Sequence, residues 1–212
     1  MNFNTFLESI ISAKTLELPG EVSQFKMSPP FRQKLVELQK EKIHKAKKAA
    51  VLALFYPDAK NHTKLVLILR KTYKGVHSAQ VGFPGGKLEE GETLEQAAVR
   101  ETFEEVGVPE TAINVIRAMS SVYIPPSNFY VYPFIGTTAK TPKFIKQDEE
   151  VEAIIEVALT DFLSDNVIIT KIVETSYSVK VEVPAFNLNG HVVWGATAMM
   201  LNEVKDLLKQ IL

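Results

Sequence analysis

Glutamates crowd the stretch from Gly86 to Val108, which holds seven of them against the two cations Lys87 and Arg100. Like charges one helical turn apart repel each other by roughly 0.2–0.5 kcal/mol per pair. The stretch is therefore costly as a plain surface helix, and a bound positive ion would offset that cost. These residue types predict carboxylate oxygens that bind a hard divalent cation, such as Mg²⁺ or Mn²⁺.

Local signals place a helix inside this stretch. Thr93 followed by Gln96 forms a capping-box pattern, and Gly107 is well suited to end a helix. We therefore predict a helix from about Leu94 to Val106. Its core-facing stripe is expected to be Val99, Phe103 and Val106.

One face of this helix is expected to collect the acids. At about 100° per residue, Glu101, Glu104 and Glu105 fall on the same side. Ala97 and Ala98 lie one turn earlier on that side, where small side chains would leave room for a ligand. Three carboxylates beside a glycine turn favour a metal site, and a solvated acidic face is the alternative.

The stretch as a whole resembles the Nudix box, the signature of the Nudix hydrolases. The matching positions are Gly86, Glu92 and the run Arg100–Val108, whereas Thr102 stands where a bulkier aliphatic residue is common and is interpreted as a packing variant. The resemblance implies an α/β fold, a Nudix α/β/α sandwich with a mixed β-sheet. It also implies Mg²⁺ or Mn²⁺ on Glu101, Glu104, Glu105 and the backbone carbonyl of Gly86.

The resemblance also implies roles for acids and cations around the metal. Arg100 would orient the site by pairing with Glu92. Nudix enzymes commonly supply one more acid from a loop after the box, as base or metal ligand, and Glu150 matches that pattern best, with Glu149 and Glu152 as rivals. A solvated charge run is the alternative for each of these three. The residues assigned to catalysis are Glu101, Glu105, Arg100 and Glu150.

A cationic loop precedes the acidic stretch. Arg70, Lys74 and His77 lie just before the turn that contains Phe83. Cations beside a metal site suit a phosphate-rich ligand, because the metal can hold the reacting phosphates while the cations hold the others. We assign these four residues to substrate binding. A loop histidine that bonds to backbone is the alternative for His77.

This loop resembles the element that precedes the Nudix box in coenzyme A pyrophosphatases. His77–Gly86 follows the usual His-x-Gly-Gln/Glu-x-x-Phe-Pro-Gly-Gly pattern, except that Ala79 replaces a glycine. Gly75 lies where many members place an arginine, a difference that concerns recognition of a 3′-phosphate. The Pro125–Ser127 turn and the His-x-x-Trp-Gly-x-Thr-Ala string from His191 are similar to the same subfamily, so the likeness covers roughly residues 49–210.

The function implied by this resemblance is hydrolysis of the pyrophosphate bond of coenzyme A or acyl-CoA. The products would be 4′-phosphopantetheine, or its acylated form, and adenosine 3′,5′-bisphosphate. One alternative is a Nudix pyrophosphatase for ADP-ribose, NADH or another nucleoside diphosphate derivative. Another is a catalytically inert Nudix module that binds a ligand. Tyr123 or Phe129 would contact an adenine or pantetheine arm, unless these rings belong to the core.

The rest of the chain must position these groups. Residues 1–48 are expected to form an N-terminal helical extension, and residues 49–212 the Nudix hydrolase domain. Thr5 and Glu8 mark a capping box in a first helix that Pro19-Gly20 ends, and a second helix begins near Ser28. The apolar stripe of the second helix is Phe31, Leu35 and Leu38. Its cations, which are frequent between Arg32 and Lys48, form either a solvated face or a surface that receives a polyanionic substrate.

The period of the hydrophobic pattern changes after residue 48. Residues 49–56 and 64–69 are expected to form an antiparallel pair covered on both faces. Further strands are expected at 112–119, 153–157 and 177–183, with a short helix at 159–163. An Asn189-Gly190 hairpin turn leads to a strand at 192–194, and a final helix opens at Gly195.

The composition restricts the partners, the chemistry and the location expected for the protein. The chain has 212 residues, 46% of them hydrophobic, with a net charge of −1 and no cysteine. So small a net charge does not favour nucleic acid or an anionic membrane as a partner. The absence of cysteine excludes thiolate chemistry. No run is long and apolar enough to predict a membrane span or a signal peptide, so a cytoplasmic protein is expected. The expected partner is a small CoA-like nucleoside diphosphate derivative. A homodimer through the N-terminal helices is left open.

Overall fold

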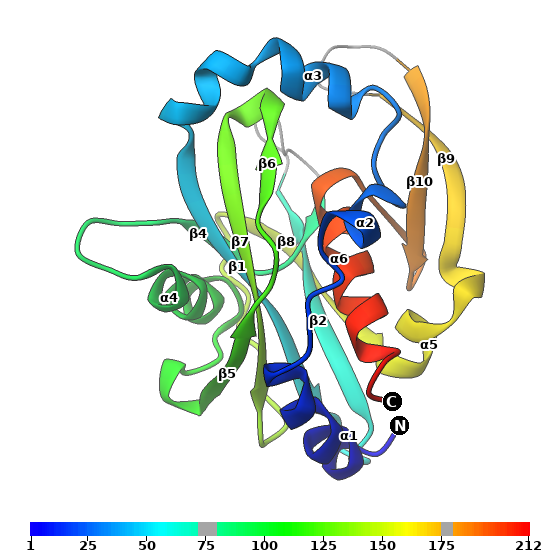
Figure 1. Ribbon diagram of the computed structural model, residues 1–212. Coiled ribbons are helices and arrows are strands. Elements are labelled where there is room, and N and C mark those ends of the chain that lie inside the picture. The colour runs from blue at the N-terminus through cyan, green and yellow to red at the C-terminus, as the bar shows by residue number, and fades with distance from the viewer. Residues whose placement is uncertain (72–79, 175–179) are drawn as a thin grey trace.

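The computed structural model describes residues 1–71, 80–174 and 180–212, and it is built around a mixed β-sheet (Figure 1). In this sheet β1 runs parallel to β7 and antiparallel to β2 and β4. The order along the sheet is β3-β2-β1-β7-β5, with β4 paired to β1, β6 to β7 and β8 to β2. The strands span β1 Lys47–Pro57, β2 Thr63–Arg70, β3 Val81–Gly82, β4 Gly85–Lys87, β5 Ile113–Ala118, β6 Val122–Ile124, β7 Phe129–Thr138 and β8 Val151–Ala158.

The alternation of β1 separates two cores. Its odd-numbered residues, such as Ala53 and Phe55, belong to the hydrophobic cluster on the side of α1 (Phe3–Ile10) and α6 (Gly195–Leu208). Its even-numbered residues, such as Leu52 and Leu54, belong to the cluster on the side of α4 (Leu94–Val106). Because side chains of a strand alternate between its faces, a sheet covered on both sides requires such a continuous apolar run. The predicted α/β/α sandwich is therefore confirmed.

The predicted central helix is confirmed as α4. Thr93 accepts a hydrogen bond from the backbone N–H of Gln96, the Gln96 side chain accepts one from the Thr93 N–H, and Gly107 adopts a left-handed φ of 76°. The predicted core-facing stripe is wrong at Phe103, whose exposure is 47%.

The buried residues of α4 include the predicted Val106, but most of the others are small. Ala97 and Ala98 are completely buried, so the room expected there for a ligand is absent. Their small side chains let α4 lie close to β1, and a bulky Phe103 on that face would hold the helix away. Thr102 is also buried and donates its hydroxyl to the Ala98 carbonyl at 2.7 Å, as the packing interpretation of this residue expects.

The N-terminal segment is helical, with bounds that differ from those expected. Asn2, not Thr5, caps α1 by accepting a hydrogen bond from the Asn4 N–H at 2.9 Å. Gly20 opens a helix rather than ending one. The second expected helix begins at Arg32 rather than near Ser28. The elements here are α1 Phe3–Ile10, η1 Ile11–Lys14, α2 Gly20–Phe25, α3 Arg32–Leu38 and η2 Lys40–Lys45.

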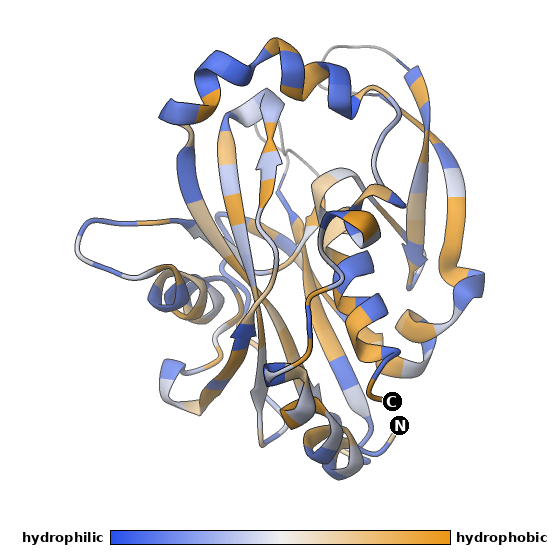
Figure 2. Ribbon diagram, in the orientation of Figure 1, coloured by the Kyte–Doolittle hydropathy of each residue, from blue (hydrophilic) through white to orange (hydrophobic). Residues whose placement is uncertain are grey.

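The helices of this segment differ in how they pack. Phe3, Phe6 and Ile10 of α1 are buried in the same cluster as Phe55 of β1, and the Phe6 and Phe55 rings lie 5.0 Å apart. By contrast, α3 has no buried residue. Figure 2 shows hydrophilic and hydrophobic residues alternating along α3, whereas the central strands are largely hydrophobic. Leu38, expected in an apolar stripe, is 72% exposed.

A buried carboxylate ties α2 to α6. Glu203 accepts hydrogen bonds from the Gly20 N–H at 3.2 Å, the Gln24 amide at 2.8 Å and the Ser120 N–H at 3.3 Å. Since Glu203 is fully buried, these three donors replace the water that the charge would otherwise need. The network holds the start of the chain against its last helix.

The C-terminal part contains a second, three-stranded sheet of order β11-β10-β9. The predicted Asn189-Gly190 turn is confirmed, with positive φ values of 50° and 81°. The strand expected at 177–183 appears from Lys180 onward, and residues 177–179 lie outside the described ranges. Strand β9 was not predicted. The elements are α5 Leu159–Leu163, β9 Ile168–Glu174, β10 Lys180–Leu188 and β11 His191–Trp194, with 3₁₀ turns η3 Glu110–Ala112, η4 Pro125–Ser127 and η5 Asp165–Val167.

In the ranges that the structure describes, none of the helices combines the length and apolarity needed to cross a bilayer.

Candidate active site

The acidic site forms where the central sheet splits. β1 pairs with β2 at Phe55–Pro57, whereas β4 occupies the place beside its earlier residues and sets Gly85 opposite Val51. This arrangement brings the glycine turn against the start of β1 and under α4. Gly85 has a φ of 149°, and a Cβ there would overlap the backbone of β1, so glycine is required.

The glycine turn contacts two of the predicted metal ligands. The Gly85 N–H donates to Glu105 Oε2 at 2.7 Å. A Cβ added at Gly86 would overlap the carboxylate of Glu101, so the absence of a side chain there lets Glu101 lie against the turn. The structure thus brings Gly86, Glu101 and Glu105 together, as the sequence predicts.

Glu105 carries an unusual charge environment. It is 2% exposed, and its Oε1 lies 3.3 Å from Arg70 Nη1 without accepting a hydrogen bond from any described residue. Burial raises the pKa of Glu105 to about 7, although the Arg70 charge and the Gly85 N–H oppose the shift. Arg70 is itself held in place, because its Nη2 donates to the Gly85 carbonyl at 2.7 Å.

Arg100 forms hydrogen bonds with three acids of the site. It donates to both oxygens of Glu92, at 3.1 and 2.9 Å, which confirms the predicted pairing. Its Nη1 lies 3.1 Å from Glu101 Oε1 and 2.9 Å from Glu104 Oε2. Arg100 therefore forms a hydrogen bond with one carboxylate oxygen of Glu101 and with one of Glu104. The second oxygen of each carboxylate remains for a further ligand.

The donor set fits a hard divalent cation. Carboxylate and carbonyl oxygens are the ligands that Mg²⁺ and Mn²⁺ prefer, and the buried Glu105 Oε1 lacks a hydrogen-bond donor. Burial also raises the pKa of Glu101, with the charges of Glu104 and Glu150 adding to the shift, so a cation would relieve real repulsion. In the described residues, however, no three acids or histidines are arranged as a ready metal cluster. Glu104, with a side chain 50% exposed, extends toward Arg100.

A loop brings further acids to the site. Its Gln147 N–H donates to the Glu105 carbonyl at 3.1 Å, and the Gln147 side chain accepts from the Glu150 N–H at 2.7 Å. Glu149 and Glu150 both line the cavity described below, whereas Glu152 does not. The choice of an additional acid therefore narrows to Glu149 and Glu150.

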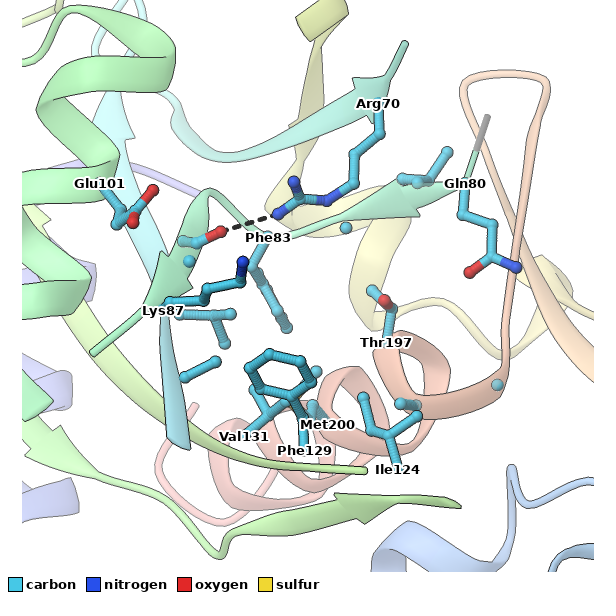
Figure 3. Close-up of a pocket in the computed structure, with 18 of the residues that line it drawn as sticks. Arg70, Gln80, Phe83, Lys87, Glu101, Ile124, Phe129, Val131, Thr197 and Met200 are labelled. Carbon is cyan, nitrogen blue, oxygen red and sulfur yellow. Dashed lines mark hydrogen bonds between the residues drawn. The ribbon is translucent and has the colours of Figure 1, made fainter. Parts of the chain in front are cut away.

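A cavity of about 770 Å³ extends from these acids. Figure 3 shows Glu101, Arg70 and Lys87 at one end and a cluster of apolar side chains, including Phe129 and Met200, across from them. Phe83 lines the cavity as a buried ring. Lys74 and His77, two predicted substrate-binding residues, lie outside the described ranges.

The two aromatic residues considered for substrate contact differ in whether they line the cavity. Phe129 lines the cavity. Tyr123 does not, and its hydroxyl donates to Asn128 Oδ1 at 2.9 Å. Trp194 also lines the cavity.

Sequence reasoning missed several lining residues. Gln80, which directly precedes β3, and Thr197, near the start of α6, line the cavity (Figure 3). Thr197 belongs to the string that begins at His191, so that resemblance offered a signal for it. Phe31 and Leu35 line the cavity from the N-terminal segment, and no local pattern could place them there, since the contact depends on the whole fold.

Comparison with known proteins gives consistent matches. The model of the NUDIX domain family matches residues 46–173. The chain is 29% identical over 155 residues to a protein of Caenorhabditis elegans named peroxisomal coenzyme A diphosphatase ndx-8, covering 72% of this chain and 64% of that one. It is 30% identical over 159 residues to Nudix hydrolase 3 of the same organism, covering 68% and 66%. The chain thus spans less than two thirds of the length of these relatives.

Solved structures show the same fold at low identity. The Nudix hydrolase RenU of M. smegmatis matches with a TM-score of 0.55 and 18% identity, over 79% of this chain and 88% of that one. A MutT protein of Methanosarcina mazei matches with a TM-score of 0.50 and 14% identity, over 78% and 97%.

Proposed function

The chain belongs to the NUDIX domain family, and from this membership we propose that it hydrolyses the pyrophosphate bond of coenzyme A or an acyl-CoA. The observation that carries the chemistry is the buried Glu105 between the Gly85 N–H and Arg70 at one end of the cavity. The choice of substrate rests on the relative named as a coenzyme A diphosphatase and on the resemblance of His77–Gly86 to that subfamily.

The acids and the glycine turn would hold the metal. Glu101, Glu104, Glu105 and the Gly86 carbonyl supply hard oxygen ligands for Mg²⁺ or Mn²⁺. When bound, such ions neutralise developing charge on phosphate oxygens and acidify water. Arg100 fixes the orientation of Glu101 and Glu104 through its hydrogen bonds, which are anchored by the Glu92 pair. Arg100 is thus a positioning residue.

The remaining residues act on the substrate and on water. Arg70 faces the cavity beside Glu105 and would hold a phosphate oxygen there. A water oxygen forms a bond to one phosphorus, and the bond from that phosphorus to the bridging oxygen breaks. The leaving phosphate keeps the bridging oxygen, so the diphosphate becomes two phosphate monoesters. A proton of the water passes to a carboxylate oxygen, for which we assign Glu150.

A substrate panel tests the proposal. Purified protein is incubated with Mg²⁺ or Mn²⁺ and with CoA, acetyl-CoA, ADP-ribose or NADH, and the products are separated by chromatography. We expect adenosine 3′,5′-bisphosphate and 4′-phosphopantetheine from CoA, and none in the presence of a chelator. If ADP-ribose is cleaved while CoA stays intact, the substrate assignment is wrong.

Glu105→Gln tests the assigned ligand. The amide keeps the shape of the side chain but supplies no negative charge to a cation, so metal-dependent turnover should fall at least about 100-fold while the thermal transition persists. Unchanged turnover would show that Glu105 does not hold the metal.

A further inference from the structure

We propose that α3 forms one wall of a compartment for an aliphatic arm of the substrate, so that the enzyme prefers diphosphates with such an arm over those whose arms are polar throughout. This inference rests on the proposed function, because it places the diphosphate at the acidic end of the same cavity. It gives Leu35, in the N-terminal segment, a role in specificity.

The first argument is the packing of α3. None of its residues is buried, yet Arg32 and Leu35 line the cavity together with the preceding Phe31. Apolar side chains that remain accessible lack the stabilisation that removing their surface from water would bring. A ligand with apolar surface would cover Phe31 and Leu35, whereas a polar ligand would gain little from them.

The second argument is the chemistry of other residues that line the cavity. Ile124 of β6, Phe129 and Val131 of β7 and Met200 of α6 line the cavity, and Figure 3 shows these four grouped away from Glu101 and Arg70. The cavity therefore has a charged end and an apolar end. A diphosphate whose phosphates lie at the first can place an attached aliphatic chain at the second.

The third argument is that α3 has defined anchors. The Arg32 guanidinium donates to the Tyr123 carbonyl, so the charge that α3 brings to the cavity already has a partner on β6. Met27, just before α3, is 2% exposed, and α2 is tied to α6 through Glu203. In Figure 1, α3 accordingly crosses above the ends of β6 and β7. A wall held in place can discriminate between arms of different chemistry.

The size of the cavity agrees with this division. Its volume of about 770 Å³ lies within the range of about 300–1,000 Å³ that holds drug-sized ligands. The acids, Arg70 and the glycine turn occupy one end, which leaves the rest for the arms of the substrate.

The test compares two substitutions on the same helix. Leu35→Glu places a carboxylate in the compartment, and Leu38→Glu places one on a side chain that is 72% exposed and does not line the cavity. Because α3 contributes no buried residue, both variants should keep the thermal transition of the parent protein. For octanoyl-CoA, Leu35→Glu should lower kcat/KM about tenfold, mainly through KM, since burying a charge against the chain is unfavourable.

The controls make the result specific. Leu38→Glu with octanoyl-CoA should stay within about twofold of the parent, and in Leu35→Glu the loss should be larger for octanoyl-CoA than for a diphosphate whose arms are polar. Equal losses for octanoyl-CoA in the two variants would overturn the inference, because a general charge effect would then explain them. No loss in Leu35→Glu would overturn it as well.

A binding measurement separates this inference from the proposed function. The sequence has a single tryptophan, Trp194, which lines the cavity, so its fluorescence can report octanoyl-CoA binding without turnover. If no diphosphate is hydrolysed but octanoyl-CoA binds the parent about tenfold tighter than Leu35→Glu, the proposed function fails and the compartment stands. If octanoyl-CoA is hydrolysed and binds both equally well, the compartment fails alone.

Discussion

Gly86→Ala should remove activity while leaving the fold intact. A Cβ at this position would lie closer than 3.0 Å to the three carboxylate atoms of Glu101. Unstrained carbon contacts are about 3.5–4.0 Å apart, so the carboxylate must swing away by about 1 Å. The movement also strains its 3.1 Å bond to Arg100. Because the displaced atoms end a side chain and Gly86 has no left-handed φ, the backbone can stay in place.

The expected loss of activity in Gly86→Ala can be estimated. A misplacement of 1 Å in a reacting site costs roughly 100-fold in rate, so kcat/KM should fall by about that factor. The thermal midpoint should move by no more than about 4 °C, which corresponds to roughly 1 kcal/mol for a chain of this size. Calorimetric titration with Mn²⁺ should show weaker binding, since Glu101 is an assigned ligand.

Gly91→Ala is the matched control. Gly91 has a φ of 85° but no atom within 4 Å of an added Cβ, so alanine brings backbone strain without a clash. Its cost should be about 1–2 kcal/mol of stability with little change in kcat/KM. If Gly86→Ala instead keeps kcat/KM within threefold of the parent, the contact between Gly86 and Glu101 has no part in the reaction.

Two further predictions concern stability. Glu203→Ala leaves the Gly20 and Ser120 N–H groups without their acceptor, and the free energy of unfolding should fall by about 1–3 kcal/mol in urea titrations; an unchanged value would contradict the assigned role. Burial raises the pKa of Glu105 from 4.5 to about 7, so metal-free folded protein binds a proton that the unfolded chain releases. Stability in chelator should therefore fall as the pH rises from 4.5 through 7, and Glu105→Gln should lose this slope.

Local signals explain which elements could be predicted. The bounds of α4 follow from Thr93, Gln96 and Gly107, which act within a few residues of themselves, and β1 and β2 follow from long apolar runs. The orientation of α4 was harder to predict because it depends on its neighbours. Phe103 carries the largest apolar side chain of the helix, yet the close approach to β1 admits only small residues such as Ala97 and Ala98.

The same distinction applies to the site. The acids of α4 and the turn at Gly86 were recognisable because they lie within one stretch of sequence, and Arg100 and its partner Glu92 are only eight residues apart. The contribution of the apolar residues of the N-terminal segment was not recognisable. Phe31 and Leu35 line the same cavity as Met200 only when both ends of the chain pack on the sheet, and a pattern within α3 carries no information about so distant a segment.

The two ends of the cavity therefore come from different parts of the chain. The charged end is built largely from Gly85 to Glu105, where Gly85 contacts Glu105, Gly86 lies against Glu101, and Glu92 is paired with Arg100. The apolar end uses α3, which contributes no buried residue and so can change with little cost to the core. A fold with this division can keep one reaction on the diphosphate while substitutions in α3 alter which arm it accepts. Substrate preference in such a chain would then be governed by residues that the acidic stretch does not contain.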